Sequence, residues 1–167
     1  RAFTARWACR AYASQDELLS DTSVELVVNL TNPRSHFDIN RACLEASKHV
    51  YSEKPLAMTV EEALHLVEVA ARRDLYLAAA PCSLLSETAQ TLWKAVRDGA
   101  IGQVRVVYAN FDDGMIAPRQ SPWRWVNERG VPWPAKDEFE VGCTYQHAGY
   151  VLTWLAAMFG PATRMSA

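Results

Sequence analysis

The stretch Val50-Tyr51-Ser52-Glu53-Lys54-Pro55 decides how this chain is interpreted. Its first residues are typical of a short β-strand, and an acid, an amine and a proline follow directly after them. Ligands gather at the carboxyl ends of the strands in open parallel sheets, so Glu53 and Lys54 are candidate site residues. The competing interpretation is a solvated charged pair at a surface turn.

The segments around this stretch alternate between short apolar strands and amphipathic helices. Strands are expected at residues 10–13, 24–30, 49–52 and 75–80. The run at 24–30 is almost continuously apolar, which predicts a strand buried on both faces. The alternation predicts an α/β fold, in which a partial doubly wound parallel sheet carries helices on both faces.

The intervening helices are marked by their first residues and by their apolar spacing. Ser14 with Glu17 and Thr59 with Glu62 fit capping boxes, and a further helix is expected to open at residues 35–38. The spacing of the helix after Thr59 predicts an inward stripe, which consists of Val60, Ala63, Leu64, Val67 and Ala71.

The pattern changes after Pro81, where we place a domain boundary. Residues 1–81 are expected to form the first domain, and residues 82–167 to begin an α+β domain. The second part predicts a helix around 85–96, a strand over 104–111, a long ordered loop over 112–139 and a final helix that ends at Gly160-Pro161.

Composition and charge exclude several classes of protein. The 167 residues are half apolar and carry 17 basic and 19 acidic side chains, a net charge of -2, so neither a nucleic acid nor an anionic membrane is an expected partner. No apolar run approaches the roughly 20 residues of a membrane span. The chain opens on Arg1 without an initiator methionine, and we expect a fragment of a longer protein.

The four cysteines are far apart in the sequence and lack the spacing of metal ligands. Cys9, Cys43, Cys82 and Cys143 are expected to be reduced and mostly buried in a cytoplasmic protein, with no metal site.

Two longer stretches carry a resemblance to a known family. Residues 24–33 with His36, and residues 48–56 with the Glu-Lys-Pro element, resemble the glucose-fructose oxidoreductase and inositol dehydrogenase (Gfo/Idh/MocA) family of NAD(P)-dependent enzymes. Residues 98–102, and His147 followed by residues 151–155 and Gly160-Pro161, are similar to later parts of the same family.

The resemblance implies a Rossmann domain followed by an α+β domain, NAD or NADP as cofactor, and a carbohydrate-like substrate such as a sugar, polyol or cyclitol. It also implies a homo-oligomer. The family's Gly-rich pyrophosphate turn has no counterpart among the seven glycines of this chain. Cys143 stands where the family often has an Asp, four residues before the catalytic His, and Tyr150 stands where another Asp is frequent.

The resemblance assigns catalytic roles to Lys54 and His147. An imidazole suits proton exchange near neutral pH, and an ammonium group stabilises a developing alkoxide. We therefore expect the two side chains to face one cavity. A lone histidine beside a buried helix is more often a structural group, which is the competing interpretation of His147.

The residues expected to bind the cofactor follow the same two strands: Thr31, Asn32, Pro33, His36, Glu53, Lys54 and Pro55. An Asn-Pro turn that merely starts a helix is the alternative for residues 31–33, and His36 either faces the cofactor or caps that helix.

Four further residues are candidate substrate contacts: Trp123, Arg124, Tyr145 and Gln146. An aromatic face matches the C–H face of a sugar, and Trp125 and Trp133 offer such faces as well as Trp123. The alternative is that these residues pack a loop onto its own domain, which is the commoner case. Arg124 would bind a carboxylate or phosphate of an acidic substrate. Tyr145 and Gln146 either orient the substrate or cap the final helix.

Three functions are compatible with these patterns. The first is an NAD(P)-dependent oxidoreductase that transfers a hydride between the cofactor and a sugar, polyol or cyclitol hydroxyl. The second is an NAD-dependent glycoside hydrolase of the same fold. The third is a noncatalytic binding or oligomerisation module, which the absent glycine turn motivates.

Overall fold

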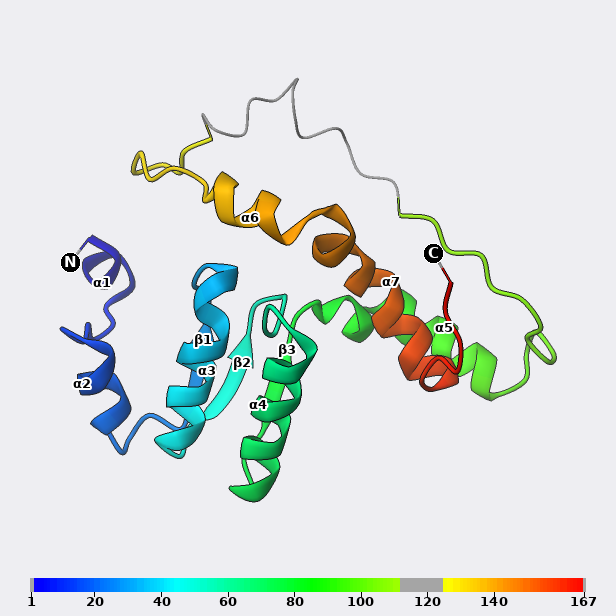
Figure 1. Cartoon of the computed structure of the whole chain (residues 1–167), viewed down its shortest axis with the longest axis horizontal. Helices are drawn as coiled ribbons and strands as arrows, with labels where there is room; N and C mark the ends of the chain where they lie inside the picture. Colours follow the sequence, from blue (N-terminus) through cyan, green and yellow to red (C-terminus); the bar gives the residue numbers. More distant parts are fainter. Residues whose placement is uncertain (1, 112–124, 167) are drawn as a thin grey trace.

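A three-stranded parallel sheet lies at the centre of the first half of the chain. The computed structural model describes residues 2–111 and 125–166 (Figure 1). Its strands are ordered β1 (Leu26–Asn29), β2 (His49–Ser52) and β3 (Leu77–Ala79). Val50 of β2 lies between Val27 and Leu77 in the register. The predicted parallel α/β fold is confirmed, and β2 has the predicted bounds.

Helices connect and follow these strands. They are α1 (Ala2–Trp7), α2 (Gln15–Ser20), α3 (His36–Glu45), α4 (Val60–Arg72), α5 (Glu87–Arg97), α6 (Ala135–Val141) and α7 (Cys143–Phe159), with short 3-10 turns η1 (Pro33–Ser35) and η2 (Cys82–Leu85). Figure 1 shows α3 and α4 side by side over the sheet, whereas α7 lies beside α5 in the second half of the chain.

The predicted helix starts at Ser14 and Thr59 are confirmed. The Thr59 hydroxyl accepts a hydrogen bond from the Glu62 backbone N–H at 3.2 Å, and the Glu62 carboxylate accepts one from the Thr59 N–H at 3.2 Å. This reciprocal pair satisfies N–H groups that have no partner inside the helix. At α2 the Ser14 hydroxyl caps Glu17, but the Glu17 carboxylate bonds the N–H of Ala13 instead of that of Ser14.

The core fills the space between the sheet and helices α3 and α4. Its buried members are Cys43, Leu44, Val50, Ala57, Leu66, Val69 and Ala70. Burial of a leucine or valine side chain contributes about 1.5–3 kcal/mol. Parallel strands need crossover helices, and packing of α3 and α4 against one face aligns the carboxyl ends of all three strands.

The predicted inward stripe of α4 is correct for Ala63, which packs against the core, but wrong for its other members. Val60, Leu64 and Val67 are 65%, 58% and 52% exposed, whereas Leu66 is fully buried. The helix is apolar on two adjoining faces, so spacing alone did not distinguish them. The face that holds Leu66 and Ala70 packs against α3 and the sheet.

Three strand predictions need correction. The strand at 24–30 is not buried on both faces, because Leu26 and Val28 are each 52% exposed on an edge strand. Residues 10–13 form no strand. Residues 104–111 form none either, since no described segment pairs with them, and Tyr108 is 92% exposed.

The second half differs from the sequence expectation in one further way. The loop expected over 112–139 lies partly outside the described residues, and its described part contains an isolated antiparallel bridge between Val126 and Pro132 and most of helix α6.

The cysteines are less buried than expected. Cys9 and Cys82 are exposed, while Cys43 is buried in the core, where desolvation raises the pKa of its thiol.

Candidate active site

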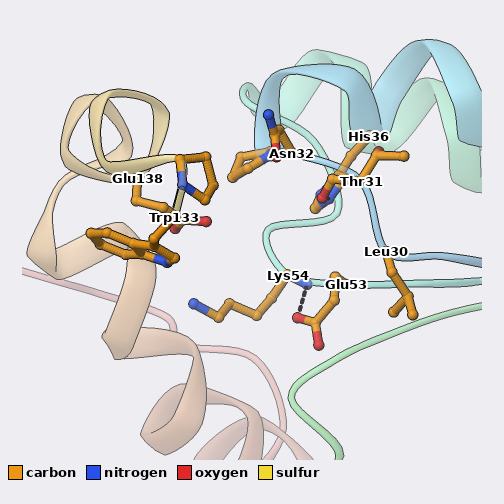
Figure 2. A pocket seen from close by; sticks show the side chains of 10 residues that line it. Leu30, Thr31, Asn32, His36, Glu53, Lys54, Trp133 and Glu138 are labelled. Atoms are coloured by element: carbon orange, nitrogen blue, oxygen red, sulfur yellow. Dashed lines mark hydrogen bonds between the residues drawn. The ribbon is translucent and has the colours of Figure 1, made fainter. Parts of the chain in front are cut away.

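A cavity of about 310 Å³ opens at the carboxyl ends of β1 and β2 (Figure 2). It is lined by Leu30, Thr31, Asn32, Pro33, His36, Glu53, Lys54, Trp133, Pro134 and Glu138. Six of the seven residues expected to bind a cofactor therefore line one cavity. The seventh, Pro55, contributes through its backbone, as described below.

The parallel register brings the two turns of the cavity together. Asn29 and Ser52 are partners in the ladder, so the turn after β1 and the Glu-Lys-Pro turn after β2 leave the sheet side by side. The Glu53 N–H donates to the carbonyl of Asn29 at 2.9 Å, which extends the pairing by one step.

Buried polar side chains at the ends of β1 and β2 and on α3 form a hydrogen-bond network that supports these turns. Asn29 donates to Oδ1 of Asn40 at 2.8 Å, and Asn40 donates to the Ser52 hydroxyl at 3.0 Å. Oδ1 of Asn29 accepts from both the N–H and the hydroxyl of Thr31, at 3.1 and 2.7 Å. Because a buried polar group that loses its partner is costly, this network holds the cavity wall in one arrangement.

The His36 side chain joins the two turns directly. Its Nδ1 lies 2.6 Å from the Pro55 carbonyl oxygen and its Nε2 lies 2.9 Å from that of Thr31, with the residue only 1% exposed. Each ring nitrogen thus lies within hydrogen-bond distance of a backbone carbonyl, one in each turn. His36 thus contacts the cavity and also bridges its walls.

Lys54 is held through its backbone and through the end of its side chain. Its backbone N–H donates to the Glu53 carboxylate at 3.0 Å (Figure 2). Its Nζ donates to Oε1 of Gln146 on α7, and Nε2 of Gln146 donates in turn to the Glu138 carboxylate on α6. Figure 2 shows the lysine side chain extending toward Trp133 and Glu138, away from His36.

Charged and polar contacts dock α6 on the turn after β1. Arg34 pairs with Glu140 and lies 3.7 Å from the Asp137 carboxylate, and Asn32 donates to Asp137 at 3.3 Å. The Tyr145 hydroxyl donates to the Ala57 carbonyl at 3.2 Å, which ties α7 to the segment after β2. The described contact of Tyr145 therefore connects two parts of the chain.

His147 lies beside the cavity but not among the residues that line it. Its ring stacks on Phe111 and Tyr150, with centroids 5.3 and 6.4 Å away, and the Lys54 Nζ lies 6.0 Å from the Tyr150 ring. Tyr150 therefore contacts both predicted catalytic residues. The catalytic role of His147 stays a prediction, and Trp123 and Arg124 lie outside the described residues.

Sequence reasoning missed Glu138, which faces the cavity from a helix that was expected to be loop. The signal was present, because Pro134 followed by Asp137 and Glu138 is typical of the first turn of a helix. Trp133, considered above for sugar stacking, also lines the cavity, and its ring packs at 5.2 Å from Trp125.

Comparison with known proteins identifies the class of this fold and site. Residues 1–80 match the family described as "Oxidoreductase family, NAD-binding Rossmann fold" (Gfo/Idh/MocA). The parallel sheet and the cavity at the ends of its strands agree with that class. Residues 1–80 therefore belong to the Gfo/Idh/MocA oxidoreductase family, and the predicted resemblance is confirmed.

Curated relatives agree with this assignment. An uncharacterised oxidoreductase of Schizosaccharomyces pombe is 35% identical over 113 residues, which cover 68% of this chain and 31% of the relative. Myo-inositol 2-dehydrogenase of Thermotoga maritima is 29% identical over 98 residues, 59% of this chain and 29% of the relative. The chain thus spans about a third of the length of these relatives.

Solved structures show the same fold. The match to UDP-N-acetylglucosamine 3-dehydrogenase GnnA from Acidithiobacillus ferrooxidans has a TM-score of 0.53 at 32% identity. It covers 56% of this chain and 30% of that protein's chain. The match to an NAD-binding oxidoreductase from Klebsiella pneumoniae has a TM-score of 0.74 at 22% identity and covers 94% of this chain and 40% of that protein's chain.

Within the described residues, no helix has the length and apolarity to cross a membrane.

Proposed function

We propose that the protein carrying this chain is an NAD(P)-dependent dehydrogenase that oxidises a hydroxyl of a sugar, polyol or cyclitol. The observation that carries the proposal is the position of the Lys54 ammonium. It projects from the carboxyl end of β2 into the cavity, and Gln146 holds it from a helix 92 residues later in the sequence.

The residues of the cavity fit one end of a nicotinamide cofactor. Thr31, Asn32 and Glu53 present hydroxyl, amide and carboxylate groups at the ligand edge of the sheet, where ribose hydroxyls can be bonded. The cofactor, when bound, accepts the hydride. A Gly-rich pyrophosphate turn is not part of this sequence, so these residues account for the nicotinamide and ribose end alone.

The Lys54 ammonium is suited to assist the oxidation of an alcohol. Its ammonium donates a hydrogen bond to the substrate oxygen and stabilises the negative charge that grows there as the hydride leaves. Gln146 restrains the side chain, so the donor is already aimed before the substrate arrives. In the proposal His147 receives the hydroxyl proton, and Tyr150 contacts both side chains.

A ring-shaped neutral substrate fits the other wall of the cavity. Trp133 lines it and is braced by Trp125 and by Phe139, whose ring centroid lies 5.9 Å away. A fixed indole face suits the C–H face of a sugar or cyclitol. The relative named myo-inositol 2-dehydrogenase is, by its name, a dehydrogenase of a cyclic alcohol, which supports this class.

The proposal includes a cytoplasmic homo-oligomer. Widely spaced cysteines without a pairing pattern support a reducing compartment. The oligomer follows from family resemblance.

The test measures reduced nicotinamide produced by the full-length protein with a panel of sugars, polyols and cyclitols. Lys54→Met keeps the length of the side chain and removes the donor, so we expect kcat to fall by about 10²–10³-fold. Lys94→Met, at an exposed lysine of α5, is the matched control. Equal turnover of wild type and Lys54→Met would remove Lys54 from the mechanism.

A further inference from the structure

A chain of three side chains connects the cavity wall on α6 to the lysine on the turn after β2. Glu138 accepts a hydrogen bond from Nε2 of Gln146, and Oε1 of Gln146 accepts one from Nζ of Lys54. Gln146 is only 7% exposed, so solvent does not replace either partner freely. A buried amide is thereby placed between a carboxylate and an ammonium group.

The chemistry of the two partners fixes the orientation of the amide. A carboxylate only accepts hydrogen bonds and an ammonium only donates them, so the amide must turn its NH₂ group to Glu138 and its oxygen to Lys54. With Glu138 removed, the amide keeps only one of the two partners that select this orientation, and its NH₂ group loses its acceptor. In the reversed orientation its NH₂ group would face the Lys54 ammonium, where two donors meet and no hydrogen bond forms.

We infer that Glu138 is a positioning residue, which acts through Gln146 to hold the Lys54 ammonium toward the reacting hydroxyl. The inference rests on the proposed dehydrogenase function. An ammonium carries three N–H donors, so a lysine bonded to Gln146 retains donors for a substrate oxygen. Glu138 also places a carboxylate at the wall of the cavity.

A double-mutant cycle tests the coupling. Glu138→Ala in the full-length protein should lower kcat by about tenfold or more while the dissociation constant of the cofactor changes by less than about twofold. Gln146→Leu removes the amide that connects Glu138 to Lys54. Glu138→Ala added to Gln146→Leu should therefore change kcat by less than about twofold.

Lys136→Ala is the matched control on the same helix, because Lys136 is exposed and is not a member of the chain from Glu138 to Lys54. It should leave kcat within about twofold of wild type. If Glu138→Ala lowers kcat equally with glutamine and with leucine at position 146, or lowers it in neither, the inference is overturned.

A second measurement separates this inference from the proposed function. In a ¹⁵N-labelled protein, the side-chain amide signals that disappear in Gln146→Leu belong to Gln146. We expect Glu138→Ala to shift these signals and Lys136→Ala to leave them in place. A wild-type protein without hydride transfer would refute the dehydrogenase, whereas Gln146 signals that are unmoved in Glu138→Ala would refute the role of Glu138.

Discussion

The Lys54 ammonium and the Gln146 amide are hydrogen-bonded, although 92 positions separate them in the sequence. One residue follows a strand of the Rossmann sheet and the other lies on helix α7, beyond the expected domain boundary at Pro81. The lysine is therefore oriented by a part of the chain that the sheet does not contain. The candidate site therefore depends on how these two segments pack.

The first prediction concerns His147. His147→Asn removes a proton acceptor while keeping a polar side chain of similar size, so kcat for hydride transfer should fall by about 10²–10⁴-fold. His65→Asn is the control, because His65 is exposed on α4. Turnover that is the same in His147→Asn and wild type would assign the ring a packing role beside Phe111 and Tyr150.

The second prediction concerns the bridge formed by His36. His36→Phe keeps an aromatic ring but removes the two ring nitrogens that contact the carbonyls of Thr31 and Pro55, and a buried carbonyl left without a donor costs about 1–3 kcal/mol. Urea denaturation should show a lower midpoint with an unchanged slope. A midpoint equal to that of wild type would show that the two carbonyls find other donors.

Sequence reasoning succeeded where local rules decide the outcome. The bounds of β2 and the reciprocal cap of Thr59 and Glu62 follow from a few neighbouring residues, and the structure contains both. The cavity residues on the two turns were also predictable, because the ends of parallel strands meet at one edge.

It failed where distant contacts decide. The face that α4 buries depends on α3 and the sheet, and the spacing of its residues fits two faces almost equally well. The role of Gln146 depends on Glu138 and Lys54, which come from two other segments. Residues 104–111 have strand-like composition, but a strand also needs a neighbour to pair with.

The third prediction tests the orientation of α4. Leu66 is fully buried and Leu64 is 58% exposed, two positions away on the same helix. Leu66→Ala should lower the free energy of unfolding by about 2–5 kcal/mol, because it removes core contacts and leaves a cavity. Leu64→Ala should change it by less than about 0.5 kcal/mol. The opposite order, measured by urea denaturation, would restore the stripe that spacing alone predicts.

The fourth prediction concerns Asp21, the residue after α2. Hydrogen bonds from the Ser23 hydroxyl and backbone N–H, then from the Tyr12 hydroxyl, lower the pKa of the Asp21 carboxyl from 3.8 to about 2. A pKa that is lower in the folded state means that the ionised carboxylate stabilises the fold. This contribution is complete above pH 3.8 and is lost as the pH falls toward about 2.

The difference in unfolding free energy between wild type and Asp21→Asn should therefore be constant near neutral pH and shrink between about pH 4 and pH 2. Titration of the Asp21 carboxyl by NMR gives a sharper comparison. Ser23→Ala removes the largest cause of the shift, so it should raise the pKa of Asp21 more than Tyr12→Phe does. A larger rise in Tyr12→Phe would show that the phenol, and not the serine hydroxyl, is the main partner of the carboxylate.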